Sequence, residues 1–465
     1  MSAGLLEKES TGGAIAREGF EYQDAFVLQH LPLWLSQSAF SHVVSEAIGD
    51  VEVCYFASTG GVRRVMYEAK DHTLTAPKFW DEIDRFRTVF ETSPTEYVRF
   101  VLVCRDYNTV TSPLLAKVAR LRGVGSSYQS DSVFLANGRT EVIDWAMNNG
   151  YRADLAAFVL DHVDFLSFAA EHADSAFSGE VEKHLPCIDP SGRQVGRLRD
   201  KCKGHIARSS SGPVYRKDIE AAICEMLGED STHWASAPSR VHLLDGLGSL
   251  QELGLDVGGF NGPGRATKST SDWHSLSDAA TGIGEFIKES TLRRCIVLDG
   301  KQRMSTACLL GRVYSATRGF VLEIEHNGLV YRTDVHDRSD DRFFNEVTTT
   351  GHPGTCEGVA CIGFPTPVGA DLNSVSVGEL ARLSKLNLDS TRSIDGMEVL
   401  NVAVAEAKAA LVRFRSQNAL SKVHLVVKAP SVFAMVLGHR LNGVCEVQLY
   451  DWVDGQYVPT ALLSS

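Results

Sequence analysis

Two carboxylates and a lysine are spaced as a metal-dependent phosphodiesterase would need. Glu68 and Lys70 are separated by one residue within 64–70, a segment whose composition predicts a β-strand. Side chains alternate along a strand, so both would point to the same face. Asp50 opens the preceding predicted strand, 50–56, and a turn between the strands would bring it beside Glu68. Close carboxylates repel unless a cation lies between them, and Mg²⁺ favours one or two carboxylates with water and phosphate oxygens.

The neighbouring lysine adds a second function to this group. Lys70 would orient or deprotonate the attacking water, or offset negative charge on the transition state. An acid-x-lysine triplet by itself is as typical of a salt-bridged pair on an exposed strand. The hypothesis of a Mg²⁺ or Mn²⁺ site formed by Asp50 and Glu68 therefore depends on the surrounding elements, and Glu46 and Glu52 are alternatives to Asp50 as the first metal ligand.

The predicted elements occur in the order helix, strand, strand, helix, strand. A helix at 14–37 comes first, and after the two strands follow a helix at 77–90 and a buried strand at 97–104. Gln23 lies in the apolar stripe of the first helix, where a buried amide must find a hydrogen-bond partner, and a structural hydrogen bond is the plainest interpretation. The other members of that stripe are Phe20, Val27, Leu31 and Trp34.

A different pattern in the second half of the chain is typical of phosphate binding. Two predicted strands, 295–298 and 424–427, are each followed by a short loop and a helix. Free N–H groups and the dipole at a helix N-terminus attract anions. The candidate ligand contacts in these two loops are Lys301, Arg303, Lys428 and Ser431. Trp273, in a polar segment, is a further candidate for stacking on a base, with packing in the core as the alternative.

These two loops belong to an internal repeat. A shift of 127 residues aligns identical residues without a gap, and it predicts that one strand–loop–helix–strand unit is used twice. Two such units related by a pseudo-two-fold axis would grasp a ring-shaped, multiply phosphorylated ligand from both sides. The aligned positions are Lys301 with Lys428, Ala307 with Ala434, Leu310-Gly311 with Leu437-Gly438, Leu322 with Leu449, Gly328 with Gly455, and Thr333 with Thr460.

Charge is distributed unevenly along the 465 residues. The net charge of −12 argues against a protein that coats nucleic acid through bulk charge. The segment 191–217 nevertheless holds eight basic residues and one acidic residue, so it carries +7 and the remainder −19. It is interpreted as a DNA-backbone contact or as a solvated hinge, and a domain boundary is expected near the Ser/Gly/Pro run at 209–213. The candidate DNA contacts are Arg197, Arg199, Lys201 and Lys203.

Nothing in the sequence predicts export or membrane insertion. The first residues lack the basic start and apolar run of a signal peptide, and no segment approaches the length of a membrane span. The ten cysteines are scattered without a C-x-x-C pair. Reduced, packed thiols in a cytoplasmic protein are the expectation.

At this point the residues resemble known families. Asp50 with Glu68-x-Lys70 in an αββαβ order resembles the PD-(D/E)xK nucleases, with Gly49 in place of the eponymous proline. The segment 13–23 resembles the opening helix of the nuclease domain of bacterial CBASS anti-phage effectors. That helix carries an active-site Glu or Gln, a role that would fall to Gln23.

The second half resembles the SAVED domain, a fusion of two CARF-like units that senses cyclic oligonucleotides. The resemblance rests on 295–333 and 422–460. Together the two resemblances imply an α/β protein with a restriction-endonuclease-like domain at 1–208 and a SAVED domain at 209–465. The second SAVED copy would occupy about 400–465.

The combination resembles the nuclease–SAVED effectors of CBASS operons, and it implies a bacterial defence enzyme. A partner nucleotidyltransferase (CD-NTase) would make a cyclic tri- or dinucleotide. The SAVED domain would bind this messenger, protomers would associate into a homo-oligomer, and the nuclease would degrade double-stranded DNA. Two alternatives stay open: a messenger-sensing, DNA-binding scaffold with an inactive nuclease, and a restriction nuclease that recognises modified DNA.

Overall fold

The chain divides near Trp234 into two compact units. The computed structural model describes residues 8–464 except 59, 126–127, 129–131, 209–211, 247, 301, 337–340, 353 and 369–379. Among the described residues, no helix is both long enough and apolar enough to cross a bilayer.

The first unit is built on a six-stranded sheet with the order β5-β4-β3-β2-β1-β6. Strands β1 to β3 pair antiparallel, whereas β3, β4 and β5 run parallel. The strands are β1 (Phe40–Ser45), β2 (Val51–Phe56), β3 (Val62–Lys70), β4 (Tyr97–Cys104), β5 (Val163–Ser167) and β6 (Val214–Tyr215). The predicted αββαβ order is found with one strand more, because β1 precedes the predicted pair.

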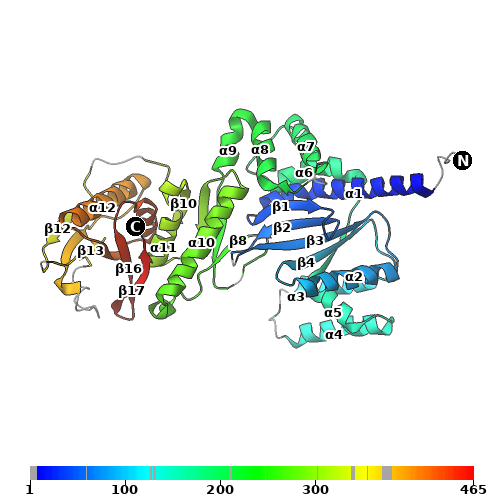
Figure 1. The fold of residues 1–465 in the computed structure, drawn as a ribbon, viewed down its shortest axis with the longest axis horizontal. Helices are drawn as coiled ribbons and strands as arrows, with labels where there is room; N and C mark the ends of the chain where they lie inside the picture. The colour runs from blue at the N-terminus through cyan, green and yellow to red at the C-terminus, as the bar shows by residue number, and fades with distance from the viewer. Residues whose placement is uncertain are drawn as a thin grey trace. The chain divides into compact units, whose positions relative to one another are not determined.

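Helices α1 (Lys8–Ser36) and α2 (Ala76–Thr92) cover opposite faces of this sheet (Figure 1). On one face Tyr67 of β3 packs against Phe26 of α1, with ring centroids 5.3 Å apart. On the other face Met66 joins the apolar side chains of α2 in a buried cluster. The predicted stripe of α1 is confirmed except at Phe20, which is 49 % exposed. The first unit also contains α3 (Ser112–Gly125), α4 (Val133–Asn148), α5 (Ala153–His162), α6 (Ala173–His184), α7 (Gly192–Ile206), α8 (Arg216–Leu227) and α9 (Ser231–Ser236).

The basic segment forms α7 rather than a hinge, and the chain stays in the first unit beyond it. Strand β6 pairs with β1. Arg216 is buried, forms an ion pair with Glu220, and donates hydrogen bonds to backbone carbonyls that include that of Leu35. These contacts fasten β6 and α8 to the sheet, so the compact unit extends past the boundary expected at 208. Residues 209–211 of the expected linker lie outside the described residues.

The second unit contains two sheets. Their orders are β11-β10-β9-β7-β8 and β12-β14-β13-β15-β16-β17. The strands are β7 (Ser239–Leu244), β8 (Leu253–Asp256), β9 (Cys295–Asp299), β10 (Val321–His326), β11 (Leu329–Arg332), β12 (Asn345–Thr349), β13 (Glu357–Gly363), β14 (Ser384–Asp389), β15 (Lys422–Lys428), β16 (Glu446–Val453) and β17 (Gln456–Leu463). The helices are α10 (Thr270–Ser290), α11 (Met304–Val313), α12 (Met397–Gln417) and α13 (Ser431–Arg440).

The internal repeat predicted from the sequence is present in the fold. The series β9-α11-β10-β11 corresponds to β15-α13-β16-β17, and both copies end in a hairpin whose turn has positive φ at Asn327-Gly328 and Asp454-Gly455. The strand orders also correspond, with β7 and β8 matching β13 and β14. The second copy therefore begins well before residue 400.

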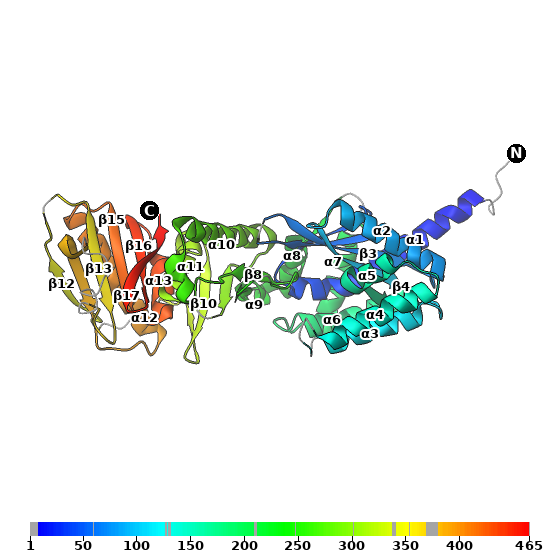
Figure 2. The same ribbon diagram turned by 90° about the horizontal axis from the view of Figure 1, so that it is seen from below.

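Helices α11 and α13 lie side by side (Figure 2). A Cβ on Gly311 would meet the Met435 carbonyl oxygen at 2.1 Å, and one on Gly438 would meet the Cys308 carbonyl oxygen at 2.1 Å. Each pair is converted into the other by the 127-residue shift. Only glycine permits this close approach of two helix backbones, so the repeated Leu-Gly dipeptide marks a pseudo-two-fold axis.

Candidate active site and sensor cavity

The three residues of the acidic motif come together at the end of β3. Lys70 Nζ lies 2.5 Å from Glu68 Oε1 and 3.7 Å from Asp50 Oδ2. The backbone N–H of Ala69 donates a 2.7 Å hydrogen bond to Asp50 Oδ2, which fixes that carboxylate beside β3. The Glu68 side chain is 6 % exposed, whereas those of Asp50 and Lys70 are 19 % and 24 % exposed. The geometry thus presents two carboxylates and one ammonium at the partly exposed carboxyl end of an inner strand.

Two residues of α2 complete this group and were missed by the sequence analysis. Glu82 Oε1 lies 3.6 Å from Lys70 Nζ, and Arg85 forms ion pairs with both Glu82 and Glu68. Their positions on the charged side of an amphipathic helix are typical of a solvated face. Nothing in their local sequence therefore indicated that packing would turn them toward β3.

The two alternatives for the first carboxylate are less suitable than Asp50. Glu52 is fully buried, and its oxygens accept hydrogen bonds from the Ile48 N–H (2.9 Å) and Arg64 Nη1 (2.8 Å). Those bonds engage both carboxylate oxygens in holding the β1–β2 connection. Glu46 is exposed outside the strand. Of the three candidates for the first carboxylate, Asp50 is therefore the one that fits, 3.7 Å from Lys70 Nζ.

Gln23 is not joined to this group. It is half-buried on α1, three residues before Phe26, which contacts Tyr67 on the face of β3 opposite Glu68. Among the described residues, no hydrogen bond connects Gln23 to the acidic site. The structure therefore brings together Asp50, Glu68 and Lys70 but leaves the fourth predicted catalytic residue on the α1 side of the sheet.

The charges in the site shift its pKa values. Burial raises the pKa of Asp50 above the ordinary aspartate value, against the opposing effects of the Lys70 charge and the Ala69 N–H. For Lys70, burial works against the charged form, but the Glu68 hydrogen bond and the Asp50 charge outweigh it and raise the pKa. Lys70 is thus held as an ammonium ion beside carboxylates.

The donor set fits a small hard cation. Both Glu68 oxygens are engaged by cationic side chains, Oε1 by Lys70 and Oε2 by the Arg85 guanidinium, so a metal ion would take over part of the charge balance that these side chains now supply. Together with Asp50, Glu68 offers two carboxylates at the end of β3, and two carboxylates completed by water and phosphate oxygens are the ligand set that Mg²⁺ prefers. Among the described residues, no cluster of three or more acidic, histidine or cysteine side chains offers a fuller metal cage.

In the second unit, the two predicted loops line one cavity of about 580 Å³. Arg303, just before α11, and Ser431, at the start of α13, both face it. The side-chain Oδ1 of Asn261 accepts a 3.3 Å hydrogen bond from the Arg303 backbone N–H. The backbone carbonyl of Asn261 accepts a 3.0 Å hydrogen bond from Arg303 Nε. Gln302 also lines the cavity, and its Oε1 is buried without a hydrogen-bond partner among the described residues.

The remaining predicted ligand contacts have different outcomes. Lys301 lies outside the described residues. Lys428 is exposed at the end of β15 but is not among the residues lining the cavity. The stacking role for Trp273 is wrong, because its side chain is 2 % exposed and packs edge-on against Phe260 at 4.9 Å. A fully buried indole contributes to the core and cannot stack on a bound base.

The four candidate DNA contacts lie on α7, and most are engaged locally. Lys201 pairs with Glu225, Lys203 lies 2.7 Å from Asp174, and Arg199 lies 3.3 Å from Asp200. Arg197 is exposed.

Comparison with known proteins identifies the two domains that hold these sites. Residues 11–210 match the family described as "Cap4, dsDNA endonuclease domain", and residues 280–463 match the "SMODS-associated and fused to various effectors sensor domain", SAVED. The CD-NTase-associated protein 4 of Moraxella osloensis is 56 % identical over 464 residues, which cover 100 % of both chains. The chain belongs to the Cap4 family.

Solved Cap4 structures share the fold. The Acinetobacter baumannii Cap4 SAVED/CARF-domain containing receptor with the cyclic trinucleotide 2′3′3′-cAAA superposes with a TM-score of 0.90 at 53 % identity, covering 96 % of this chain and 99 % of that one. The Moraxella osloensis Cap4 receptor gives 0.85 at 52 % identity, covering 96 % and 100 %. Like other Cap4 proteins, this chain joins a double-stranded DNA endonuclease to a SAVED sensor of cyclic oligonucleotides and is a CBASS effector.

Proposed function

We propose that this Cap4 enzyme cuts double-stranded DNA at Asp50, Glu68 and Lys70 with Mg²⁺ or Mn²⁺, after a cyclic trinucleotide binds between its two SAVED copies. The observation that carries the proposal is the convergence of Lys70 with both carboxylates, 2.5 Å and 3.7 Å away.

Each residue of the site then has a chemical role. Asp50 and Glu68 would hold the metal, and when bound it supplies Lewis-acid stabilisation of the phosphate oxygens. Lys70, kept protonated by its neighbours, would stabilise negative charge that develops at the scissile phosphate. That role favours electrostatic stabilisation over deprotonation of water by Lys70. Glu82 and Arg85 would set the position of the ammonium and of Glu68.

The sensor cavity suits a ring of phosphates and bases. Arg303 and Ser431 would contact phosphates from the two repeats, with Lys301 and Lys428 as further contacts. The free Gln302 Oε1 would accept a hydrogen bond from an exocyclic amine of a base, a group that adenine carries. The cyclic tri-adenylate in the A. baumannii relatives supports a cyclic trinucleotide over a dinucleotide.

Ligand binding would promote homo-oligomerisation. A messenger shifts only an equilibrium whose two states it binds with different affinity. If the associated state binds the messenger more tightly, the chain stays dissociated and inactive until infection. Assembly would also align several α7 helices, whose Arg197, Arg199, Lys201 and Lys203 would contact the DNA backbone. The ion pairs that now engage Arg199, Lys201 and Lys203 are exposed and therefore weak, so DNA phosphates would replace their carboxylate partners.

A plasmid-degradation assay tests the proposal. Purified chain is incubated with supercoiled plasmid, with and without Mg²⁺, and with a panel of cyclic di- and trinucleotides. Cutting is expected only when Mg²⁺ and a cyclic trinucleotide are both present. Absence of cutting with every ligand would favour the inactive scaffold, and cutting that depends on base modification and ignores the messenger would favour the restriction nuclease.

A further inference from the structure

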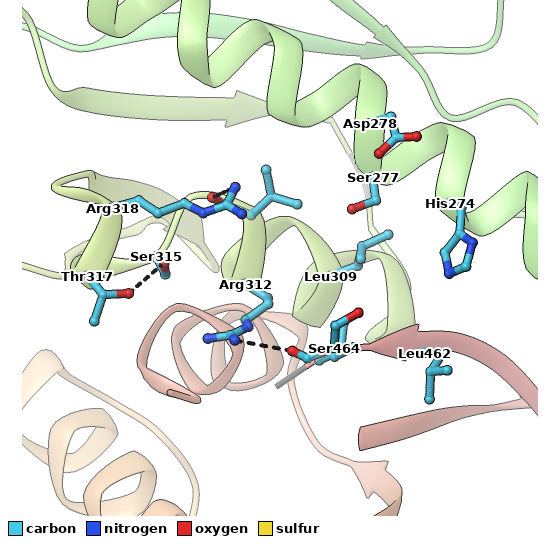
Figure 3. A pocket seen from close by; sticks show the side chains of 12 residues that line it. His274, Ser277, Asp278, Leu309, Arg312, Ser315, Thr317, Arg318, Leu462 and Ser464 are labelled. Atoms are coloured by element: carbon cyan, nitrogen blue, oxygen red, sulfur yellow. Dashed lines mark hydrogen bonds between the residues drawn. The ribbon is translucent and has the colours of Figure 1, made fainter. Parts of the chain in front are cut away.

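A second cavity lies at the other end of α11 from the sensor cavity. It has a volume of about 310 Å³, and Arg312 and Arg318 line it together with Ser315 and Thr317 (Figure 3). Arg303 and the sensor cavity are at the N-terminal end of α11, whereas Arg312 is in its last turn. The two cavities share none of their lining residues. This one is therefore a separate site.

The arginines of this cavity have unused hydrogen-bonding capacity. Arg312 donates to the Leu441 and Ser464 carbonyls at 3.1 and 3.2 Å, and Arg318 donates to the Val313 carbonyl at 3.3 Å. A guanidinium has five N–H donors, so most remain available. Among the described residues, no carboxylate lies within ion-pairing distance of either side chain, including that of Asp278 across the cavity on α10.

The two like charges are close enough to affect each other. Burial, and then the charge of Arg318, lower the pKa of Arg312 below the ordinary arginine value. Two guanidiniums that line one cavity repel each other, and a bound anion would offset that repulsion. The Ser315 and Thr317 hydroxyls, which lie 3.1 Å apart and share a hydrogen bond, line the cavity beside the arginines, and the Ser277 hydroxyl lines it from α10 (Figure 3).

We propose that this second cavity binds a small phosphate-bearing anion. A planar guanidinium can donate two parallel hydrogen bonds to two oxygens of one phosphate. The two arginines together have more free N–H groups than the two oxygens of one carboxylate would accept, so a phosphate with its additional oxygens fits better. The volume is at the lower limit for small-molecule pockets, which suits a phosphate, a pyrophosphate or a mononucleotide rather than a cyclic trinucleotide.

Calorimetric titration of the full-length chain with inorganic pyrophosphate, and separately with a mononucleotide, tests this proposal. A parallel titration with sodium chloride at the same ionic strength measures the heat that arises from charge screening alone, and this heat is subtracted. Saturable binding is expected for the wild type, and Arg318→Gln should weaken it at least tenfold. Arg318 is exposed and outside the core, so this variant is expected to fold, which its unchanged melting temperature without ligand will verify. Pyrophosphate binding alone would identify a phosphate site, and tighter mononucleotide binding a nucleotide site.

The matched control is Arg415→Gln, which removes an exposed arginine from α12 outside the cavity. It should bind pyrophosphate as the wild type does. The proposal is overturned if neither anion binds saturably, or if Arg318→Gln and Arg415→Gln bind equally. It is also overturned if Arg318→Gln loses self-association in sedimentation while anion binding is unchanged, because the surface would then serve a second copy of the chain.

Discussion

The nuclease site and the sensor cavity are built in opposite ways. In the nuclease site, charges of both signs lie close together at the end of β3, just before β2 and on α2, with Lys70 near the Asp50, Glu68 and Glu82 carboxylates. In the sensor cavity, the walls come from two copies of the same supersecondary unit, and Arg303 from one copy and Ser431 from the other line the same space.

Because of this difference, DNA cleavage and messenger binding should respond to different kinds of mutation. The nuclease site depends on contacts within hydrogen-bond distance, so a single side chain should control the rate. The sensor cavity depends on how α11 and α13 pack, so its integrity should be sensitive to backbone approach as well as to ligand contacts. The following experiments test whether cleavage and messenger binding can be affected separately.

The largest effect is expected at Lys70. Lys70→Ala should reduce plasmid cleavage about 10²–10³-fold at saturating messenger and Mg²⁺, because it removes the positive charge beside the scissile phosphate. Gel densitometry of supercoiled plasmid measures it. Lys78→Ala, which removes an exposed lysine of α2, is the control. Cleavage by Lys70→Ala within tenfold of the control would contradict the site assignment.

Next in size are the two glycines at the helix crossing. Gly311→Ala and Gly438→Ala would each place a Cβ 2.1 Å from a carbonyl oxygen, so both should destabilise the chain by about 1–3 kcal/mol or more. Urea unfolding provides the measurement. Gly204→Ala on α7, where no atom lies within 4 Å of the new Cβ, should cost nothing. Unequal effects at the two glycines would argue against the pseudo-two-fold contact.

A smaller loss is expected from the ligand contact itself. Arg303→Ala should weaken messenger binding about 10–100-fold, the range for one charge-assisted phosphate contact in a partly exposed site. Calorimetry measures the affinity, and cleavage should be restored by proportionately more messenger. The account fails here if Arg303→Ala and Arg415→Ala bind the messenger equally.

The pH dependence of cleavage should report on Asp50. Because burial raises its pKa, Asp50 takes up a proton at a higher pH than an ordinary aspartate, and metal binding weakens as the pH falls through that value. Mg²⁺ competes with the proton, so raising Mg²⁺ should move the acidic limb of the rate profile to lower pH. An acidic limb that does not respond to Mg²⁺ would assign it to another group.

The smallest effect is expected from α7. Changing Arg197, Arg199, Lys201 and Lys203 to Gln should weaken DNA binding several-fold. Its salt dependence should fall by about 0.9 in log–log slope for each phosphate that the helix no longer neutralises. Fluorescence anisotropy at several salt concentrations gives both values. An equal effect in a Lys117→Gln/Arg120→Gln variant of α3 would show that only bulk charge matters.

Local spacing was enough to predict much of the nuclease site. The distance between Glu68 and Lys70 is set by the strand alone, and the predicted strand 97–104 matches β4. Glu82 and Arg85 could not be found in this way, because their role depends on α2 packing across β3. Gln23 followed from a resemblance, and the register of α1 places it on the other face.

In the SAVED half, too, the sequence predicted the repeated unit but not the contacts that depend on packing. The 127-residue repeat predicted the duplicated unit, but the reciprocal contact of Gly311 and Gly438 exists only once the helices cross. Trp273 was predictable from its own helix: it begins a buried stripe with helical spacing that continues through Leu276, Ala280, Ile283 and Ile287. The polar residues between these positions obscured that pattern.

The most direct test of the central claim measures messenger affinity and DNA cleavage side by side on Lys70→Ala and Arg303→Ala. We predict that Lys70→Ala binds the messenger as the wild type does yet does not cut, and that Arg303→Ala binds weakly yet cuts when messenger is in large excess. Lys70→Ala losing messenger affinity as far as Arg303→Ala does, or Arg303→Ala cutting fully at wild-type messenger concentrations, would contradict the separation of recognition from chemistry.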